Sequence, residues 1–536
     1  MSTYLNSGLF RFQETLNAKI YIDKSELISV LNEYINTPQK YICVTRPRRF
    51  GKSVTANMLS AYYSKNLESA PLFDNLDISS HDSYKKHLNQ YNTIFINMTD
   101  EFNRASQNVA VMIRQITELV INEIKVSYPD YIIHNESDLA LSMQSVFDQS
   151  HTKFVIIIDE WDCIMREKKE DLDGLKLYLE WLKLIMKDKE YLALAYMTGI
   201  LPIKKYGSNS ALNMFREYSM TSAGKYAPYI GFTEDEVKSL CSKYSVDLCS
   251  MKKWYDGYSF KTCSHLFNPN SVVCAIDEES FVSYWTLTET FESLRRFIDL
   301  NMEGLRDDIV NLIARNEVVV NTANFHNDMT TFETKDDVLT LLIHLGYLAI
   351  NPESDNKLVD NNRIFAVRIP NEEIRYEFRD VTKENKNYSG VYKLINQSLD
   401  LLEDIWEMRI DRVAEAFDTA HQDHTSILKY NDENSLSCVI SLALYLGTVD
   451  TYSVYRELPA GKGFADMVYL PKQGIDKPAL LVELKYDKSA VTAIDQIKQK
   501  NYGRIVRDYK GKVLLVGINY DKDTKDHQCL IESMQI

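Results

Sequence analysis

The sequence lacks the features that mark a secreted or membrane protein. Its longest apolar stretch, "VLTLLIHLGYLAI", is broken by His344 and Gly346, well short of the roughly 20 residues that a membrane-spanning helix needs. The first residues, "MSTYLNSGLFRF", contain no continuous apolar core of a signal peptide. The eight cysteines include no Cys-x-x-Cys pair and no zinc-finger spacing, so reduced thiols are the simplest interpretation. We therefore expect a cytoplasmic protein without a membrane contact.

An excess of positive charge is also absent. The chain has 61 basic and 76 acidic residues and a formal net charge of −15, which favours solubility but gives no global attraction for phosphate backbones. Residues 431–536 carry equal numbers of basic and acidic side chains, so the acidic excess lies upstream. Any contact with nucleic acid must therefore be local.

The length and composition predict a soluble protein of several domains. A chain of 536 residues exceeds what one compact core holds, and the length suggests about three domains. The composition, 45% hydrophobic and 26% charged, is that of an ordinary globular protein. We place the domains at residues 1–235, 236–430 and 431–536.

Residues 1–235 alternate apolar runs with segments of helical periodicity. The runs are "YICVT" from residue 41, "TIFINM" from 93, "FVIIIDE" from 154 and "LALAYMTG" from 192. Short apolar strands separated by helices are typical of a parallel sheet that is buried on both faces. The charge run "REKKEDLD" at 166–173 is interpreted as a solvated helix entrance. We expect an α/β domain here.

The stretch "RPRRFGKSV" at 46–54 lies between a predicted strand and a predicted helix. A phosphate cradle wraps backbone N–H groups round the phosphates at a helix N-terminus, a lysine reaches the outer phosphates and a hydroxyl holds magnesium. Lys52 and Ser53 supply the last two, and Gly51 lets the backbone come close. The candidate nucleotide contacts are Arg48, Arg49, Phe50, Gly51, Lys52, Ser53 and Val54.

This loop departs from the general phosphate-binding motif. The motif has glycine where Arg46 stands, and Pro47 donates no backbone N–H. Two interpretations of Arg48 and Arg49 stay open: they replace the lost donors by touching phosphate, or they pair with an acidic neighbour such as Asp162. A second element is therefore needed to assign the loop.

Two carboxylates at the end of "FVIIIDE" supply that element. Asp159 is placed to hold magnesium through water, and Glu160 is placed to orient the attacking water. The next predicted strand ends at Thr198, where a side chain can sense the γ-phosphate. The order and spacing predict an ATPase core in which catalysis is mostly positioning and charge stabilisation. A chance meeting of a glycine turn and an acidic strand end is the alternative.

The segments "YIDKSELI", "RPRRFGKS", "IIIDEWD" and "YMTGI" resemble the AAA-ATPase-like family of bacterial proteins. In that family Arg-Pro-Arg-Arg-Phe-Gly-Lys-Ser is the normal form of the loop. The resemblance covers roughly residues 5–235 and implies a P-loop NTPase fold that binds ATP with Mg²⁺. It also implies that Arg46 departs from the general motif and not from this family's version.

Residues 236–430 are predicted to be mainly helical. A helix at 335–345, followed by strands at 346–350 and 363–369, is compatible with a winged-helix-like unit. A helical lid that packs on the ATPase is the simpler interpretation, and both stay open.

Residues 431–536 are predicted to form a small α/β domain with its own site. Asp466 lies on one predicted strand, and Glu483 and Lys485 lie on the next. Because side chains alternate along a strand, positions 483 and 485 share a face, so a carboxylate and an ammonium can converge with Asp466. Asp466 and Glu483 are candidate magnesium ligands, and Lys485 can steady hydroxide or developing negative charge. Glu433 is a further candidate for this cluster, and Gln496 and Tyr502 are candidate phosphate or water contacts.

The segments "GKGFAD", "LLVELK" and "AIDQIKQKNY" resemble the PD-(D/E)xK nuclease superfamily, in the branch often fused to the ATPase above. The resemblance covers most of the last segment and implies a restriction-endonuclease-like α/β domain. It implies metal-dependent cleavage with Asp466, Glu483 and Lys485 as catalytic residues and Gln496 as a further contact. A domain that keeps the fold and only binds nucleic acid is the alternative.

Together these observations predict an ATP-dependent protein that controls a magnesium-dependent nuclease, with DNA expected rather than RNA. The alternative is a nucleotide-gated switch or scaffold whose terminal domain binds nucleic acid without cleaving it. A homo-oligomer is left open, with Arg216 as an arginine finger for a neighbouring subunit or, more simply, as part of a local ion pair.

Overall fold

The structure is a computed structural model that describes residues 3–203, 212–285, 290–300, 302–323, 325, 332–354, 356–360, 363–384, 388–424, 433–444, 448, 451–460, 463–499, 509 and 511–534. Only the backbone is described at 290–293, 384, 389–391, 420–424, 433–435, 456–460 and 463–466. The chain divides into two compact units: Met1–Leu287 with Val319–Ile374, and Thr288–Val318 with Arg375–Ile536. The predicted middle segment, 236–430, contributes to both units.

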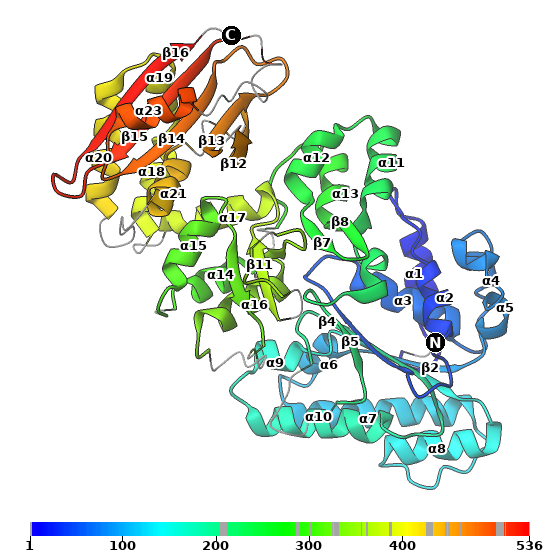
Figure 1. The fold of residues 1–536 in the computed structure, drawn as a ribbon. Coiled ribbons are helices and arrows are strands. Elements are labelled where there is room, and N and C mark those ends of the chain that lie inside the picture. Colours follow the sequence, from blue (N-terminus) through cyan, green and yellow to red (C-terminus); the bar gives the residue numbers. More distant parts are fainter. Residues whose placement is uncertain are drawn as a thin grey trace. The chain divides into compact units, whose positions relative to one another are not determined.

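The first unit contains a parallel sheet with helices around it (Figure 1). The sheet has five strands in the order β2-β3-β4-β1-β5, all paired in parallel. Its strands are β1 (Tyr41–Thr45), β2 (Asn92–Asn97), β3 (Phe154–Asp159), β4 (Leu192–Gly199) and β5 (Arg216–Tyr218). The first four are apolar runs with almost every residue buried, as a parallel sheet covered on both faces requires. The predicted P-loop NTPase-like sheet is confirmed, and the short edge strand β5 was not predicted.

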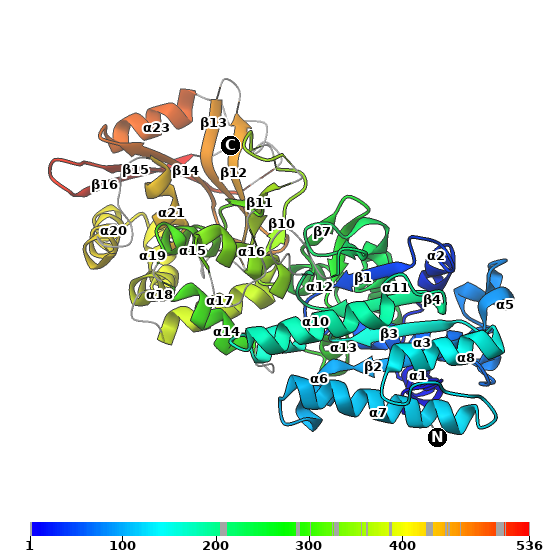
Figure 2. The same cartoon turned by 90° about the horizontal axis from the view of Figure 1, so that it is seen from below.

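Helices cover both faces of this sheet. They are α1 (Leu9–Leu16), α2 (Glu26–Asn32), α3 (Lys52–Tyr63), α4 (Ala70–Phe73), α5 (Tyr84–His87), α6 (Met98–Arg104), α7 (Val109–Ser127), α8 (Leu139–Ser150), α9 (Cys163–Glu167) and α10 (Leu172–Met186), with the 3₁₀ turn η1 (Asp77–Ser80). α6 to α10 share one apolar core with the sheet, and α3 lies against β2, β3 and β4 on the other face. Figure 2 shows α7, α8 and α10 in front of the sheet, running roughly along its strands.

Side-chain caps fix where the long helices of this unit begin. Asn108, Asp138 and Asp171 accept backbone N–H hydrogen bonds at 3.0, 3.0 and 2.9 Å at the starts of α7, α8 and α10. Each cap satisfies a donor that a helix N-terminus otherwise leaves without an intrahelical partner.

The remainder of the first unit holds two small sheets and several helices. The elements are η2 (Gly224–Tyr229), β6 (Phe232–Thr233), α11 (Glu234–Tyr244), α12 (Leu248–Tyr255), β7 (Tyr258–Phe260), β8 (Cys263–Phe267), α13 (Pro269–Asp277), β9 (Val318–Asn321), α16 (Lys335–Leu345), β10 (Ala349–Ile350) and β11 (Ile364–Arg368). The sheets have the orders β6-β8-β7 and β10-β11-β9. α16 followed by the antiparallel pair β10 and β11 is the helix-then-strands order predicted for 335–369.

The second unit combines helices with a five-stranded mixed sheet in the order β12-β13-β14-β15-β16. Its elements are α14 (Thr290–Ile298), α15 (Leu305–Ile313), α17 (Glu372–Glu384, which begins in the first unit), α18 (Ser389–Asn396), α19 (Ser398–Trp406), α20 (Ile410–His424), α21 (Glu433–Ala443), β12 (Tyr452–Ala460), β13 (Gly463–Pro471), β14 (Ala479–Tyr486), α23 (Ala490–Gln499), β15 (Val513–Tyr520) and β16 (His527–Met534). Only β14 and β15 pair in parallel. The predicted C-terminal α/β fold is confirmed, and the edge strand β16 was not predicted.

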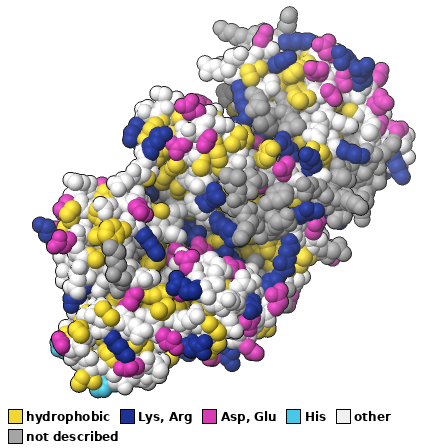
Figure 3. Space-filling view, turned by 180° about the vertical axis from the view of Figure 1, so that it is seen from behind, with side chains coloured by type: hydrophobic (Ala, Val, Ile, Leu, Met, Phe, Trp, Pro, Cys, Tyr) yellow, Lys and Arg dark blue, Asp and Glu magenta, His cyan; other side chains and the backbone are white. Residues whose placement is uncertain are grey.

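The face of the molecule shown in Figure 3 carries side chains of both charges, and the basic and acidic side chains are interspersed on it. The eight cysteines are free thiols. Across the described ranges, no helix combines the length and the hydropathy that crossing a membrane requires.

Candidate nucleotide site and candidate nuclease site

The candidate nucleotide site lies at the carboxyl ends of neighbouring parallel strands. Asn97 pairs with Asp159 at the ends of β2 and β3, and Val44 pairs with Thr198 near the ends of β1 and β4. Because parallel strands end at one edge of the sheet, the loop after β1 and the carboxylates after β3 come together there. This edge is where open α/β sheets bind their ligands.

Lys52 begins α3 directly after the loop. Its Nζ donates to the Pro47 carbonyl at 3.0 Å and lies 3.7 Å from Glu160 Oε1. Burial lowers the pKa of Lys52, and the negative charges of Glu160 and Asp159 oppose that shift. Gly51 has φ 91°, the left-handed region that favours glycine, although a Cβ there would meet no atom within 4 Å. Lys52 therefore lies beside Asp159 and Glu160 at the end of β3, as the sequence predicted.

Arg46, which replaces the glycine of the general motif, points into the protein. Its Nη1 donates to the carbonyls of Thr45 at 2.8 Å and Tyr218 at 3.3 Å, and its guanidinium lies 5.3 Å from the centre of the Phe260 ring. The side chain is fully buried, and burial lowers its pKa to about 10. Arg46 therefore packs the loop against β5 and β7.

Two further loop residues contact the remainder of the first unit. The Phe50 ring is buried and meets Tyr258 edge to face at 5.3 Å. A Cβ on Gly346 would lie 2.7 Å from Pro47 Cγ, so the backbone after α16 presses against the loop. The Tyr258 hydroxyl donates to the Gly346 carbonyl at 2.6 Å, which joins both contacts. Arg46, Pro47 and Phe50 thus hold one side of the loop against β7 and the segment after α16.

The other loop positions face outward to different degrees. Arg48 is half-buried, and Arg49 is exposed with φ 66°. Ser53 and Val54 are exposed on the first turn of α3. Their roles as nucleotide contacts stay predictions.

Asp159 is the buried carboxylate of the site. It has no exposed surface, and burial raises its pKa to about 6, against the effect of hydrogen bonds from Ser53 and from the Glu160 backbone. The Glu160 N–H donates to Asp159 Oδ1 at 3.0 Å, and Asn97 Nδ2 lies 3.4 Å from Oδ2. Ser53 and Asp159, the two residues predicted to hold magnesium, are therefore neighbours.

Glu160 lies between two cations, one of which sequence reasoning missed. Arg166 Nη2 donates to Glu160 Oε2 at 2.6 Å, and Arg166 Nε donates to Asp162 Oδ2 at 3.1 Å. Arg166 begins the charge run interpreted as a solvated helix entrance, yet its side chain is only 11% exposed. The available signal was its position four residues after Asp162, which lies just past the end of β3 at the start of α9.

Thr198 lies in β4 next to these groups and is fully buried. Its hydroxyl has no hydrogen-bond partner among the described residues. Its carbonyl accepts a hydrogen bond from the Trp161 N–H at 3.0 Å, which ties β4 to the turn that carries Glu160. The position agrees with the predicted contact, and the contact itself stays a prediction.

In the second unit, Glu483 and Lys485 form a buried ion pair on β14. Lys485 Nζ donates to Glu483 Oε1 at 3.2 Å and to the Leu484 carbonyl at 2.7 Å. Glu483 has no exposed surface, and Lys485 is 4% exposed. The structure therefore places this carboxylate and this ammonium together on one face of the sheet, as the alternation along the strand predicted.

That face is the one covered by α23. Leu481 and Leu515 pack with Ile494 and Ile497 of α23, and positions 483 and 485 share the face of Leu481. A Cβ on Gly517, which pairs with Glu483, would lie 2.6 Å from the Ala490 carbonyl. The start of α23 therefore approaches the site closely. Gln496 lies half-buried in the same helix.

Asn519 is a second residue that sequence reasoning missed. It pairs with Lys485 across the parallel strands and is fully buried. Its Oδ1 accepts the Lys488 N–H at 2.9 Å, and its Nδ2 has no hydrogen-bond partner among the described residues. A polar residue at the end of an apolar strand was the signal that could have found it.

The other predicted nuclease residues are placed by their backbones or lie outside the description. Asp466 belongs to β13 and precedes Met467, which pairs with Val482 next to Glu483. Glu433 begins α21. The side chains of Asp466 and Glu433, and all of Tyr502, lie outside the described residues.

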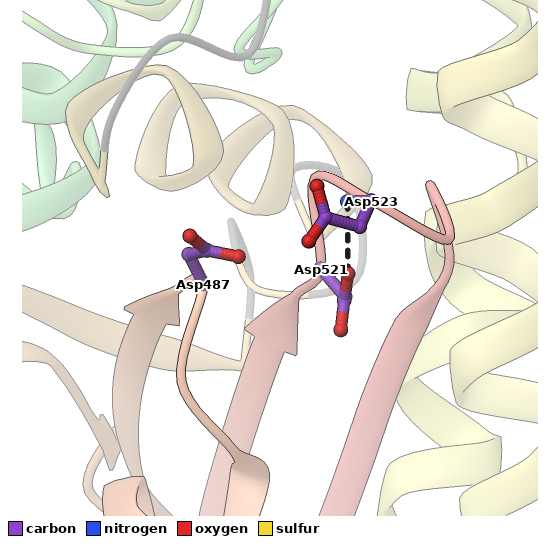
Figure 4. A group of neighbouring side chains, drawn as sticks. All are labelled: Asp487, Asp521 and Asp523. Carbon is purple, nitrogen blue, oxygen red and sulfur yellow. Dashed lines mark hydrogen bonds between the residues drawn. The ribbon is translucent and has the colours of Figure 1, made fainter.

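Three carboxylates gather at the ends of β14 and β15, as Figure 4 shows: Asp487, Asp521 and Asp523. Asp521 Oδ1 accepts the Asp523 N–H at 2.9 Å, which forms the turn between β15 and β16. Lys522 Nζ lies 2.5 Å from Asp487 Oδ2. This group is accounted for as a turn and an ion pair.

Two family models match the chain. A family described as Predicted AAA-ATPase matches residues 8–208, and the PD-(D/E)XK nuclease superfamily matches residues 431–528. The chain therefore carries an AAA-ATPase-like domain followed by a PD-(D/E)XK nuclease superfamily domain. The fusion that the sequence motifs indicated is confirmed.

Individual proteins match at low identity. An "Uncharacterized protein in vnfD 5'region" of Azotobacter chroococcum mcd 1 is 24% identical over 281 residues, 50% of this chain and 51% of the relative. The chain thus matches about half the length of this curated relative. Among solved structures, the Aeropyrum pernix ORC2 protein in ADPNP and ADP complexes matches with a TM-score of 0.30 and 12% identity, over 68% of this chain and 97% of that one.

Proposed function

We propose that this protein binds and hydrolyses ATP, and that its nucleotide state controls a magnesium-dependent nuclease that acts on DNA. The observation that supports the ATPase most strongly is the convergence of Lys52, Asp159 and Glu160 at one sheet edge. A lysine at a helix N-terminus beside two strand-end carboxylates is the set of groups that phosphoryl transfer uses.

The donors at the ATPase site fit magnesium. Asp159 and Ser53 offer a carboxylate and a hydroxyl oxygen next to each other, and Mg²⁺ takes oxygen ligands with one or two carboxylates. Bound there, Mg²⁺ neutralises charge on the phosphates. These two residues are the ones that would hold the ion, Ser53 directly and Asp159 through water.

The protein's own groups then divide the work on ATP. The Lys52 ammonium and the backbone N–H groups at the start of α3 bind the outer phosphates. Glu160 accepts a hydrogen bond from the attacking water and orients it in line with the γ-phosphate. Thr198 supplies its hydroxyl to the γ-phosphate, and Arg48 or Arg49 adds charge at the mouth of the loop.

In the second unit the proposed cleavage site is Asp466, Glu483 and Lys485, with Gln496 as a phosphate or water contact. Glu483 offers the carboxylate oxygens that Mg²⁺ takes as ligands, and Lys485 beside it is a hydrogen-bond donor and not a metal ligand. Magnesium held by Asp466 and Glu483 would supply an activated water. Lys485 steadies the hydroxide and the charge that develops on the phosphate.

The experiment measures ATP hydrolysis and DNA cleavage by the full chain, with and without magnesium. Lys52→Ala and Glu160→Gln should lose hydrolysis, and Asp466→Ala and Lys485→Ala should lose cleavage. The controls are Lys86→Ala and Lys498→Ala, because both lysines are exposed and lie outside the proposed sites. Full hydrolysis by Lys52→Ala, or full cleavage by both nuclease variants, would contradict the assignment.

A second candidate function is supported by the burial of the nuclease pair. Glu483 and Lys485 are almost fully enclosed, which a domain that only binds nucleic acid also permits. The protein would then be a nucleotide-gated switch or scaffold. DNA affinity without cleavage under every nucleotide condition, together with ATP-dependent assembly, would favour it.

The remaining proposals concern the organisation and setting of the chain. We retain residues 1–235, 236–430 and 431–536 as ATPase, middle and nuclease segments. A cytoplasmic location is supported by the eight free cysteines, since reduced thiols are the usual state there. Arg216 lies over the Tyr34 ring at 5.9 Å within the first unit, which agrees with a local structural role.

A further inference from the structure

Arg166 connects two carboxylates that have different partners. Its Nη2 donates to Glu160 at 2.6 Å and its Nε donates to Asp162 at 3.1 Å. The guanidinium is a rigid fork, so engaging both carboxylates fixes one relative to the other. Arg166 lies on α9, directly after the turn that carries both acidic residues.

Asp162 in turn fixes the backbone that follows Thr198. Its carboxylate is fully buried and accepts the N–H groups of Ile200, at 3.2 Å, and Leu201, at 2.9 Å. A Cβ on Gly199 would lie 2.4 Å from Asp162 Oδ1, so β4 ends directly against this carboxylate. Glu160, Arg166, Asp162 and the end of β4 therefore form one connected network.

Contacts with neighbouring residues must hold Glu160 in place, because its backbone conformation is unfavourable. Its φ is 52°, a left-handed conformation that few residues other than glycine adopt. The second cation, Lys52, lies farther away at 3.7 Å. When the phosphates of ATP engage Lys52, Arg166 is the cation that continues to hold Glu160.

We propose that Arg166 is a positioning residue for ATP hydrolysis: it holds the Glu160 carboxylate at the attacking water and ties that carboxylate to the backbone after Thr198. The inference rests on the proposed ATPase function. Arg166 acts through Glu160, so its loss lowers turnover and leaves nucleotide affinity nearly unchanged. Misplacing a catalytic group by about 1 Å costs about 100-fold in rate.

The primary test uses Arg166→Lys, which keeps the positive charge but loses the fork. We expect kcat to fall by about 10- to 100-fold, with the Kd for ATP within about 3-fold of wild type. Arg166→Ala should lose more turnover. Arg166→Ala leaves the buried Asp162 without this cation and leaves Glu160 with Lys52 alone, so the variant can fold less well. The kcat and Kd of the lysine variant therefore decide the test.

A double-mutant cycle with Glu160→Gln makes the test specific. If Arg166 acts through Glu160, adding Arg166→Lys to Glu160→Gln causes no further fall in the residual turnover. Independent, multiplying effects would overturn the proposal. So would an unchanged kcat in Arg166→Lys, or a loss of affinity as large as the loss of turnover.

The same cycle separates this inference from the function on which it rests. Wild-type turnover in Glu160→Gln would refute the proposed role of Glu160 itself. An inactive Glu160→Gln beside a fully active Arg166→Lys would refute the inference alone. Lys168→Ala is the matched control, since its ammonium donates to the Gln107 carbonyl on the exposed side of the same segment.

Discussion

The two candidate sites hold a lysine and a carboxylate in different ways. At the ATPase site Lys52 lies 3.7 Å from Glu160, which has a second cation in Arg166. At the nuclease site Lys485 lies 3.2 Å from Glu483, and both side chains are almost fully enclosed. Both lysines are buried, with side chains 4% and 5% exposed, so the difference lies in the carboxylates: Glu160 is 20% exposed and Glu483 has no exposed surface. Because Glu160 also has Arg166, Lys52 can leave it for a ligand at less cost than Lys485 can leave Glu483.

The largest effect is expected from Lys485→Ala. Removing one partner of a buried ion pair leaves the other charge uncompensated and destabilises by about 3–5 kcal/mol. Denaturant unfolding of the full chain measures this, followed through the second unit's transition. The control Lys498→Ala removes a surface ion pair to Glu532 and should change stability by less than about 1 kcal/mol. Equal effects of the two substitutions would remove the contrast between the sites.

Lys52→Ala should affect activity much more than stability. Glu160 keeps Arg166 as its partner, so the free energy of unfolding should fall by far less than in Lys485→Ala. Loss of a charged group that stabilises the transferring phosphoryl group should lower ATP turnover by about 100-fold or more. Steady-state hydrolysis and thermal unfolding of the same preparation check both statements. A destabilisation as large as that of Lys485→Ala would show that Lys52 is a structural residue.

Two glycines test how firmly the back of the phosphate loop is held. Gly346 and Gly474 both have a left-handed backbone, with φ 88° and 85°. A Cβ on Gly346 would collide with the side chains of Pro47 and Trp285, whereas a Cβ on Gly474 would meet no atom within 4 Å. Alanine at either position carries a left-handed strain of about 1 kcal/mol, and the collision should add about 1–2 kcal/mol at Gly346. Unfolding measurements on Gly346→Ala and Gly474→Ala compare the two. Equal losses would mean that the loop is not packed against this segment.

The smallest predicted effect is a pH dependence of magnesium nucleotide binding. Burial raises the pKa of Asp159 to about 6, so lowering the pH from 7 to 5 protonates the carboxylate and weakens the affinity. The stability of the metal-free protein depends on pH in the opposite direction. Folding favours the protonated form of Asp159, and this contribution to the free energy of unfolding is lost as the pH rises through about 6. Titration calorimetry over this range measures the affinity.

Asp159→Asn is the matched control for that titration. The pH dependence that remains in this variant belongs to the nucleotide and to other groups. An identical pH profile in wild type and variant would show that Asp159 does not titrate in the binding step.

The features that could be predicted from the sequence are those determined by residues close together along the chain. Buried strands such as "FVIIID" are continuous apolar runs, and the loop before Lys52 sits between a strand and a helix, so both could be recognised. The alternation along β14 likewise placed Glu483 and Lys485 on one face. These features require only periodicity and neighbouring residues.

What could not be predicted depends on contacts between distant segments. Arg46 points inward, where its guanidinium lies over the ring of Phe260. Arg166 is buried because it pairs with Glu160 and Asp162, and the turn after β3 determines where these two carboxylates lie. Asn519 becomes a neighbour of Lys485 only through the parallel pairing of β14 and β15. A linear pattern contains no signal for such pairings until the sheet order is known.

The most direct test of the central claim is DNA cleavage by wild type, Lys52→Ala and Lys485→Ala with ATP, with a non-hydrolysable analogue and without nucleotide. We expect that cleavage by wild type changes with the nucleotide, that Lys52→Ala loses this response, and that Lys485→Ala does not cleave under any condition. Cleavage by Lys485→Ala at the wild-type rate, or a wild-type nucleotide response in Lys52→Ala, would contradict the central claim.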